Sequence, residues 1–183
     1  MAAHAVPAPL AQIPNALTVV RLVLIPIFIA LVLASDGGHS WPAAIVFGVA
    51  GVTDQIDGWL ARRWRVESSF GKIADPLADR LMIDAAVVLL WHAGRLPWVA
   101  LAIPARDVAL LAGYRLVVDR GYDFSVNLAG KAATWLLYAS LAFVMVTDEG
   151  TDWPLWLFWA GFGLAAVALV GYVRKARREV RVS

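Results

Sequence analysis

The stretch GVTDQIDGWLARRWRVESSFGKIADPLADRLMID, residues 51–84, carries six carboxylates inside an otherwise strongly apolar chain. It joins two apolar segments, at 41–60 and 76–91, through a short basic loop. Two helices joined by so short a loop must be antiparallel neighbours, so their acidic ends come together. This stretch therefore predicts both how these helices pair and where the polar chemistry lies.

The composition indicates a membrane protein. Of 183 residues, 61% are hydrophobic and 16% are charged, and the mean hydropathy is +0.69. Soluble domains carry about 25% charged residues. The length suits one domain, and the lack of cysteine excludes disulfides, thiolate metal sites and cysteine nucleophiles.

Apolar segments recur six times, each near or below the ~20 residues that span a bilayer. They predict an all-α, polytopic membrane protein with six transmembrane helices, at 17–35, 41–60, 76–91, 98–118, 132–147 and 153–173. A single membrane domain then covers 1–183, with a flexible or interfacial lead-in at 1–13 and a basic cytoplasmic tail at 174–183. A signal peptide ending near Ser35 is disfavoured, because Pro26 interrupts the apolar run.

Lys and Arg set the orientation. With both termini cytoplasmic, the inner loops and tail hold twelve of these residues and the outer loops hold only Arg95. The positive-inside rule thus predicts a multi-pass protein whose acidic stretch faces the cytoplasm. The excess of Arg over Lys points to a GC-rich bacterium, so the expected location is a bacterial inner membrane.

Helical spacing gathers the acidic stretch onto two faces. Positions i, i+3, i+4, i+7 and i+8 of the second segment are Asp54, Asp57, Gly58, Ala61 and Arg62. Positions i, i+4 and i+8 of the third are Gly71, Asp75 and Asp79. Pro76, which follows Asp75, suits the first turn of a helix and predicts a helix start there.

Four carboxylates that converge in this way would repel one another without a cation. Only oxygen ligands are at hand, which favours Mg²⁺ or Mn²⁺ over Zn²⁺, and four acids suit two ions. Small residues leave room for a ligand, and Arg62 can bind a phosphate bidentately. The structural alternative is a set of interfacial acids paired with Arg62, Arg63 and Arg80.

The full string Asp54-x2-Asp57-Gly58-x2-Ala61-Arg62-x8-Gly71-x3-Asp75-x3-Asp79 resembles the signature of the CDP-alcohol phosphotransferases. The resemblance implies that an acceptor hydroxyl attacks the lipid-linked phosphorus of a CDP-lipid and releases CMP. It also implies that Asp54, Asp57 and Asp75 bind the metals, and that Asp79 is both a metal ligand and the general base. The CDP-lipid would then be bound by Gly58, Ala61, Arg62, Ser68 and Gly71.

Two further features are similar to branches of this family. Asn15, Thr18 and Arg21 look like the opening of the glycerophospholipid branch, so Asn15 and Thr18 are candidate CDP-lipid contacts. The alternative is a helix N-cap followed by an interfacial arginine. The string FGKIADPLADR resembles the phosphatidylglycerophosphate synthase and eukaryotic-type cardiolipin synthase branch.

That branch leaves two acceptors open, glycerol 3-phosphate and phosphatidylglycerol, and both need a phosphate site. The candidates are Arg106, Arg115 and Lys131. The sequence around Arg106 and Asp107 leans toward a cardiolipin-synthase-like subgroup. Counted in residues from the cytoplasmic ends of the third and fourth helices, Asp84 and Arg106 lie at similar depths in the membrane. An intramembrane ion pair with Asp84 is therefore an equally good alternative role for Arg106.

A different acceptor or a different class of protein would also be compatible with parts of the sequence. The same chemistry could act on inositol phosphate or serine. A small cation transporter is the alternative from a different class. It would place its acids near the midplane, whereas here they lie at the cytoplasmic ends of the helices.

The resemblance implies a homodimer, for which Gly161 and Gly163 are a weak packing signal. No nucleic-acid partner is expected. An interfacial belt is predicted from Trp41, Trp91, Trp98, Trp153 and Trp156.

Overall fold

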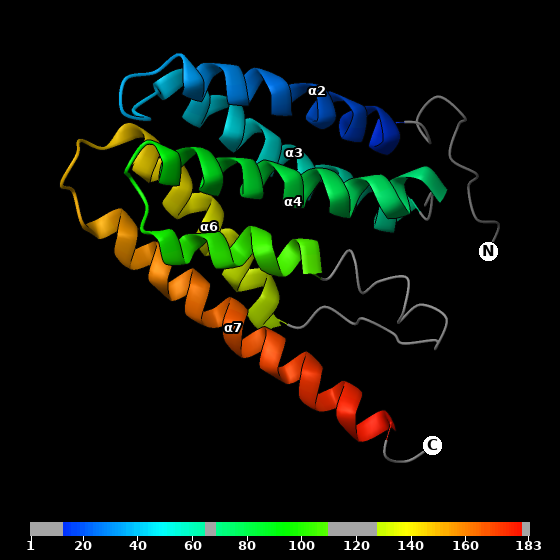
Figure 1. Ribbon diagram of the computed structural model, residues 1–183. Helices are drawn as coiled ribbons and strands as arrows, with labels where there is room; N and C mark the ends of the chain where they lie inside the picture. The colour runs from blue at the N-terminus through cyan, green and yellow to red at the C-terminus, as the bar shows by residue number, and fades with distance from the viewer. Residues whose placement is uncertain (1–12, 65–68, 110–127, 181–183) are drawn as a thin grey trace.

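The computed structural model describes residues 13–64, 69–109 and 128–180, and these ranges form helices without strands (Figure 1). The prediction of an all-helical fold is therefore confirmed for the described residues. The elements are α2 (Ile13–Leu33), α3 (Trp41–Trp64), α4 (Ser69–His92), the 3-10 helix η1 (Trp98–Leu101), α6 (Leu128–Val146) and α7 (Trp153–Val180). Helical structure continues from η1 over residues 102–109.

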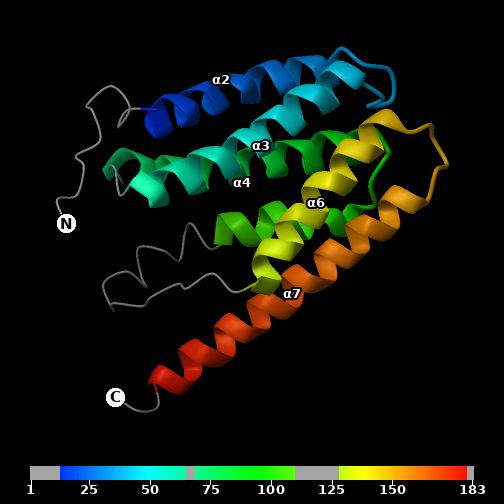
Figure 2. The same ribbon diagram turned by 180° about the vertical axis from the view of Figure 1, so that it is seen from behind.

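The connections 34–40, 93–97 and 147–152 meet at one end of the bundle (Figures 1 and 2). There the Ser40 amide donates to the Met145 carbonyl at 2.8 Å. Arg95 Nη2 donates to the Val144 carbonyl at 2.6 Å and also to the Thr147 carbonyl, which satisfies carbonyls at the end of α6. At the opposite end α2 and α4 begin and α3 and α7 end.

The short connections make helices that follow one another in the chain neighbours in the bundle. Helix α2 lies against α3 and α4, and α6 lies against α7 and α3. Three aromatic rings join the two groups: the Phe28 and Phe47 centroids are 5.4 Å apart, and those of Phe47 and the partly buried Tyr138 are 4.8 Å apart. Many large apolar side chains nevertheless face outward, among them Val23, Ile45 and Val167, each more than half exposed.

By length and composition, one helix of the described residues could cross a membrane, over Ala16–Leu33. Two shorter apolar stretches are Ala132–Val146 and Trp153–Ala168. Helices do occupy all six predicted positions, although the fourth is described only to residue 109. The predicted lead-in lies almost wholly outside the described residues. Much of the predicted basic tail continues α7, which ends at Val180.

The predicted start of the third helix at Pro76 is wrong, because α4 begins at Ser69. Helix α3 likewise continues to Trp64. The predicted ends were set where apolar residues give way to polar ones. Helical backbone hydrogen bonds do not depend on side-chain polarity, and a single proline inside a helix is tolerated when neighbouring helices support it.

Gly161 allows α7 to approach α6 closely. A Cβ atom at Gly161 would lie 3.1 Å from both the Leu136 Cβ and the Leu137 backbone nitrogen, whereas a Cβ at Gly163 would meet nothing within 4 Å. Gly161 is therefore used for packing within the chain.

Gly161→Ala is expected to lower the free energy of unfolding by about 1–3 kcal/mol, because the new methyl group meets backbone that cannot move aside. Gly163→Ala is the matched control on the same helix, and it should be neutral or stabilising by up to about 1 kcal/mol. Unfolding of both variants in detergent, followed by tryptophan fluorescence, measures the difference. Equal stability of the two variants would contradict the close α6–α7 packing.

Candidate active site

The carboxylate motif lies on the last turns of α3 and the first half of α4, at the end of the bundle opposite the three connections. The structure describes the side chains of Asp54 and Asp79. Helical backbone alone is described for Asp57, Gly58, Ala61, Arg62, Gly71, Asp75, Asn15 and Lys131, whose side chains lie outside the description. Ser68 and Arg115 lie outside the described residues altogether.

A buried ion pair joins α2 to the motif. Arg21 Nη1 lies 2.8 Å from Asp54 Oδ1, and the Arg21 side chain is fully buried while that of Asp54 is 22% exposed. Thr18, one turn earlier on α2, is also fully buried. The alternative of an interfacial arginine at residue 21 is therefore wrong: α2 carries Arg21 into the bundle because an anion from α3 is there to meet it. Asn15 is the third residue of α2, so it is not an N-cap.

Asp79 is held from α6. The Tyr138 hydroxyl donates to Asp79 Oδ1 at 2.7 Å, and this is the hydrogen bond that the described residues give to Asp79. The charges of Arg21 and Asp54 lie close enough to act on Tyr138, and those of Arg21 and Arg80 act on Asp79. The two described motif carboxylates thus belong to one polar cluster formed by α2, α3, α4 and α6.

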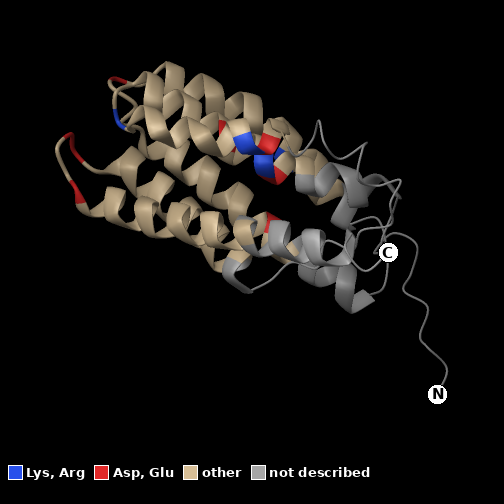
Figure 3. Cartoon of the chain, turned by 60° about the horizontal axis from the view of Figure 1, so that its bottom comes forward, with Lys and Arg blue, Asp and Glu red and all other residues tan. Residues whose placement is uncertain are grey.

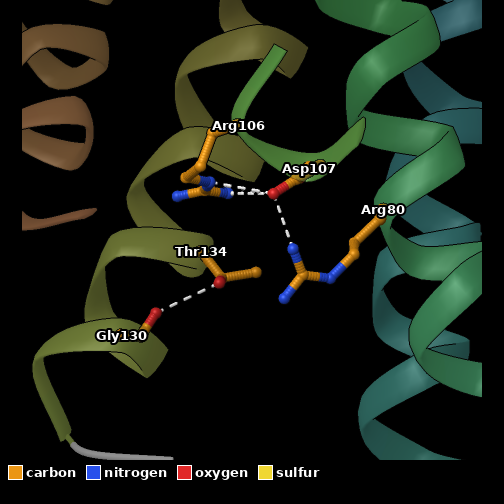
Figure 4. A network of polar contacts seen from close by, with 5 residues as sticks. All are labelled: Arg80, Arg106, Asp107, Gly130 and Thr134. Atoms are coloured by element: carbon orange, nitrogen blue, oxygen red, sulfur yellow. Dashed lines mark hydrogen bonds and ion pairs between the residues drawn. The ribbon is translucent and has the colours of Figure 1, made fainter. Parts of the chain in front are cut away.

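A second network adjoins this cluster (Figure 4). Asp107 is buried, and its Oδ1 accepts from Arg80 Nη1 at 2.6 Å and from Arg106 Nε at 2.8 Å. Two guanidinium groups therefore share one carboxylate, and the network has a positive net charge. Thr134 of α6 lies beside it in Figure 4, with its hydroxyl donating to the Gly130 carbonyl at 3.1 Å.

The predicted ion pair between Asp84 and Arg106 is not formed, because Arg106 pairs with Asp107. The depth of Asp84 was counted from a helix start at Pro76, but α4 begins seven residues earlier, at Ser69. Seven residues of helix amount to about 10 Å. Arg80, one turn before Asp84, meets Asp107 instead, and Asp84 Oδ1 is buried without a hydrogen-bond partner among the described residues.

The charges inside the bundle suit a hard cation. Within the described residues three guanidinium groups face four carboxylates: Arg21, Arg80 and Arg106 against Asp54, Asp79, Asp84 and Asp107. Asp57 and Asp75 add two more acids on the same helices. The described part holds no group of three or more metal-binding side chains, so the four-carboxylate site stays a prediction. Its donor set of oxygens alone, with an excess of negative charge, fits Mg²⁺ or Mn²⁺.

The charged groups of the described bundle lie in two places, in the connecting loops and within the helices (Figure 3). Neither the contact of Tyr138 with the motif nor the ion pairs of Asp107 were predicted from the sequence. A signal for Tyr138 exists, since Lys131, Thr134 and Tyr138 are spaced i, i+3 and i+7 and form a polar stripe on an otherwise apolar helix. No periodic signal marks Asp107, because its partner Arg80 lies on another helix.

Comparisons with known proteins find relatives that match most of the chain. A family model described as CDP-alcohol phosphatidyltransferase matches residues 11–170. The chain is 38% identical to "Cardiolipin synthase (CMP-forming)" of Streptomyces coelicolor, over 92% of this chain and 84% of that protein. It is 35% identical to the "CDP-diacylglycerol--glycerol-3-phosphate 3-phosphatidyltransferase" of Bacillus subtilis, over 80% of this chain and 86% of the other. The protein of the same name from Escherichia coli K12 is 33% identical over 87% of each chain.

Arg21→Met is expected to lower the free energy of unfolding by about 3 kcal/mol, since it leaves the Asp54 carboxylate without its buried cation. Arg106→Met is the control. Its side chain is 28% exposed, and Asp107 keeps Arg80, so a loss of about 1 kcal/mol or less is expected. Chemical unfolding of the detergent-solubilised variants measures both. If Arg21→Met lowers the free energy of unfolding less than Arg106→Met does, the buried Arg21–Asp54 pair does not stabilise the fold as expected.

Proposed function

The chain belongs to the CDP-alcohol phosphatidyltransferase family, and on that premise we propose that it transfers a phosphatidyl group from CDP-diacylglycerol to a glycerol-type alcohol, releasing CMP. The observation that carries the proposal is the family match over residues 11–170, which includes the complete motif from Asp54 to Asp79. The names of the relatives support two acceptors. Glycerol 3-phosphate would give phosphatidylglycerophosphate, and phosphatidylglycerol would give cardiolipin. None of these names suggests a cation transporter.

The proposed setting is a bacterial inner membrane, crossed six times by one domain with both termini and the motif on the cytoplasmic side. Support comes from the apolar α2 and from the outward-facing apolar side chains of the bundle. Exposed tryptophans Trp41, Trp98 and Trp156 gather near the connections, as an interfacial belt would. A homodimer within this membrane is also proposed, from the family resemblance alone.

For the reaction we assign two divalent cations, Mg²⁺ or Mn²⁺, to Asp54, Asp57, Asp75 and Asp79. Cations bound there would neutralise the diphosphate and make CMP a better leaving group. Gly58, Ala61 and Gly71 leave room for the CDP group, and Arg62 binds its phosphate, with further contacts from Ser68, Asn15 and Thr18. The buried Arg21 holds Asp54 in place from α2.

Asp79 then acts as general base. The acceptor hydroxyl loses its proton to the Asp79 carboxylate while its oxygen attacks the lipid-linked phosphorus. A new phosphorus–oxygen bond forms to the acceptor, and the bond from that phosphorus to the bridging oxygen breaks. CMP leaves with that oxygen. The hydrogen bond from Tyr138 takes one lone pair of Asp79 Oδ1, so the carboxylate keeps acceptor sites for both the metal and this proton.

The phosphate of the acceptor is assigned to Arg106, Arg115 and Lys131. Arg106 lies beside α6, on which Lys131 precedes Thr134 by one turn. The Arg106 and Arg80 side chains are 28% and 39% exposed, so neither guanidinium group is closed off by its bond to Asp107. Two cations that share one anion keep a surplus positive charge for a phosphate.

Purified protein with CDP-diacylglycerol and Mg²⁺ is expected to release CMP when one of the two acceptors, glycerol 3-phosphate or phosphatidylglycerol, is supplied. EDTA should abolish the release, because the diphosphate then lacks its counter-charge. Measuring CMP with each acceptor in parallel identifies the product. If neither acceptor supports release, the acceptor is another alcohol, with inositol phosphate and serine next to be tried.

Asp79→Asn is expected to lower turnover by roughly 10²–10⁴-fold, the usual contribution of a general base, while CDP-diacylglycerol still binds. Asp84→Asn, on the same helix but outside the motif, is the matched control and should keep its turnover. CMP release and binding of the CDP-lipid are measured for both variants. Unchanged turnover in Asp79→Asn would remove Asp79 from the mechanism.

A further inference from the structure

From its contacts with Asp79 and α3, we infer that Tyr138 is a positioning residue that orients the Asp79 carboxylate for its metal and its proton. The inference rests on the proposed function, which assigns Asp79 as metal ligand and base. Tyr138 belongs to α6, a helix that carries none of the motif carboxylates. Its hydroxyl donates to Asp79 Oδ1 at 2.7 Å across the bundle.

The ring of Tyr138 is held in place by α3. The Phe47 ring lies against it, with centroids 4.8 Å apart. A Cβ atom at Gly51 would lie only 2.9 Å from Tyr138 Cε1, so a residue without a side chain is needed where the ring passes. Gly51 precedes Asp54 by three residues on α3. The same helix therefore supplies a motif carboxylate and the space that sets the Tyr138 ring.

A phenol hydroxyl fixes a carboxylate without cancelling its charge. It engages Oδ1, limits rotation of the carboxylate group and leaves Oδ2 for other partners. Asp54 differs, because the Arg21 cation pairs with it directly. Hydrogen bonds that orient a metal-binding or catalytic group in this way are part of how such sites work.

The neighbouring residue Arg80 could cancel the charge of Asp79, but Asp107 engages it instead. Arg80 Nη1 lies 2.6 Å from Asp107 Oδ1, and Arg106 pairs with the same oxygen. The structure therefore pairs each arginine near Asp79 with another carboxylate, and gives Asp79 a neutral donor. The hydrogen bond that the described residues give to Asp79 thus comes from a group without charge.

Tyr138→Phe tests the inference because it removes the hydroxyl and keeps the ring. The melting temperature of the detergent-solubilised protein is measured over a range of Mg²⁺ concentrations, since a ligand that binds the folded state raises it. Tyr138→Phe should need roughly 10–100-fold more Mg²⁺ for half of the rise, with a similar fall in kcat and little change in the KM for CDP-diacylglycerol.

Ser140→Ala is the matched control. It removes another buried hydroxyl from α6, one that donates to the Leu137 carbonyl at 3.1 Å. Its Mg²⁺ requirement and kcat should equal those of the wild type. A purely structural role for Tyr138 would lower the melting temperature equally with and without Mg²⁺. That result, or an unchanged Mg²⁺ requirement, would overturn the inference.

Gly51→Ala is a second variant that keeps the hydroxyl, and it carries the test if Tyr138→Phe does not fold. It displaces the ring, so its Mg²⁺ requirement should also rise. In the double variant Gly51→Ala should add nothing to Tyr138→Phe, because both act through one hydrogen bond. Effects that add in full would show that Gly51 acts elsewhere and would overturn this part of the inference.

Failure of the proposed function gives a different result. Wild-type protein that shows a Mg²⁺-dependent rise in melting temperature but releases no CMP with any acceptor contradicts the proposed transfer, while the Tyr138 comparison still decides the inference. Wild-type protein with normal CMP release and a wild-type Mg²⁺ requirement in Tyr138→Phe contradicts the inference alone. A wild type without any Mg²⁺-dependent rise overturns the metal site and the inference together.

Discussion

A buried charge needs a partner, and this constraint governs the interior of the helix bundle. The fully buried guanidinium of Arg21 can lie inside an apolar bundle only because Asp54 is 2.8 Å away on the next helix. Asp107 is buried for the same reason, with two arginines on one of its oxygens. These contacts run between α2 and α3, and between α4 and the helical segment at 102–109, so the polar groups decide which helices lie together and at what depth.

The same constraint bears on chemistry. Three guanidinium groups and four carboxylates are described within the bundle. Two more motif acids, Asp57 and Asp75, lie on the same helices as Asp54 and Asp79. The described arginines Arg21, Arg80 and Arg106 pair with Asp54 and Asp107, and Asp79 accepts a hydrogen bond from the neutral Tyr138 hydroxyl. The proposed roles of Asp79, to hold a cation against a diphosphate and to take a proton from an alcohol, both need its carboxylate ionised.

Much of the fold could be predicted from sequence because apolar segments and helical spacing are local properties. In the described part of the chain, helices lie at each of the six predicted positions, the fourth being described to residue 109, and Asp54 and Asp79 lie on the antiparallel helices that the short loop required. The prediction failed where depth mattered. Polar residues do not end a helix, so α4 starts at Ser69, and the count that paired Asp84 with Arg106 was about two turns out of register.

The sequence by itself determined the family, the reaction it implies and the carboxylates that would hold the metal, because a motif with fixed spacing within two helices can be read along one chain. Only the tertiary structure decided which side chains from other helices meet those carboxylates. Arg21 is far in sequence from Asp54, Asp107 from Arg80, and Tyr138 from Asp79. Their roles depend on the rotation and register of packed helices, which spacing along a single helix does not specify.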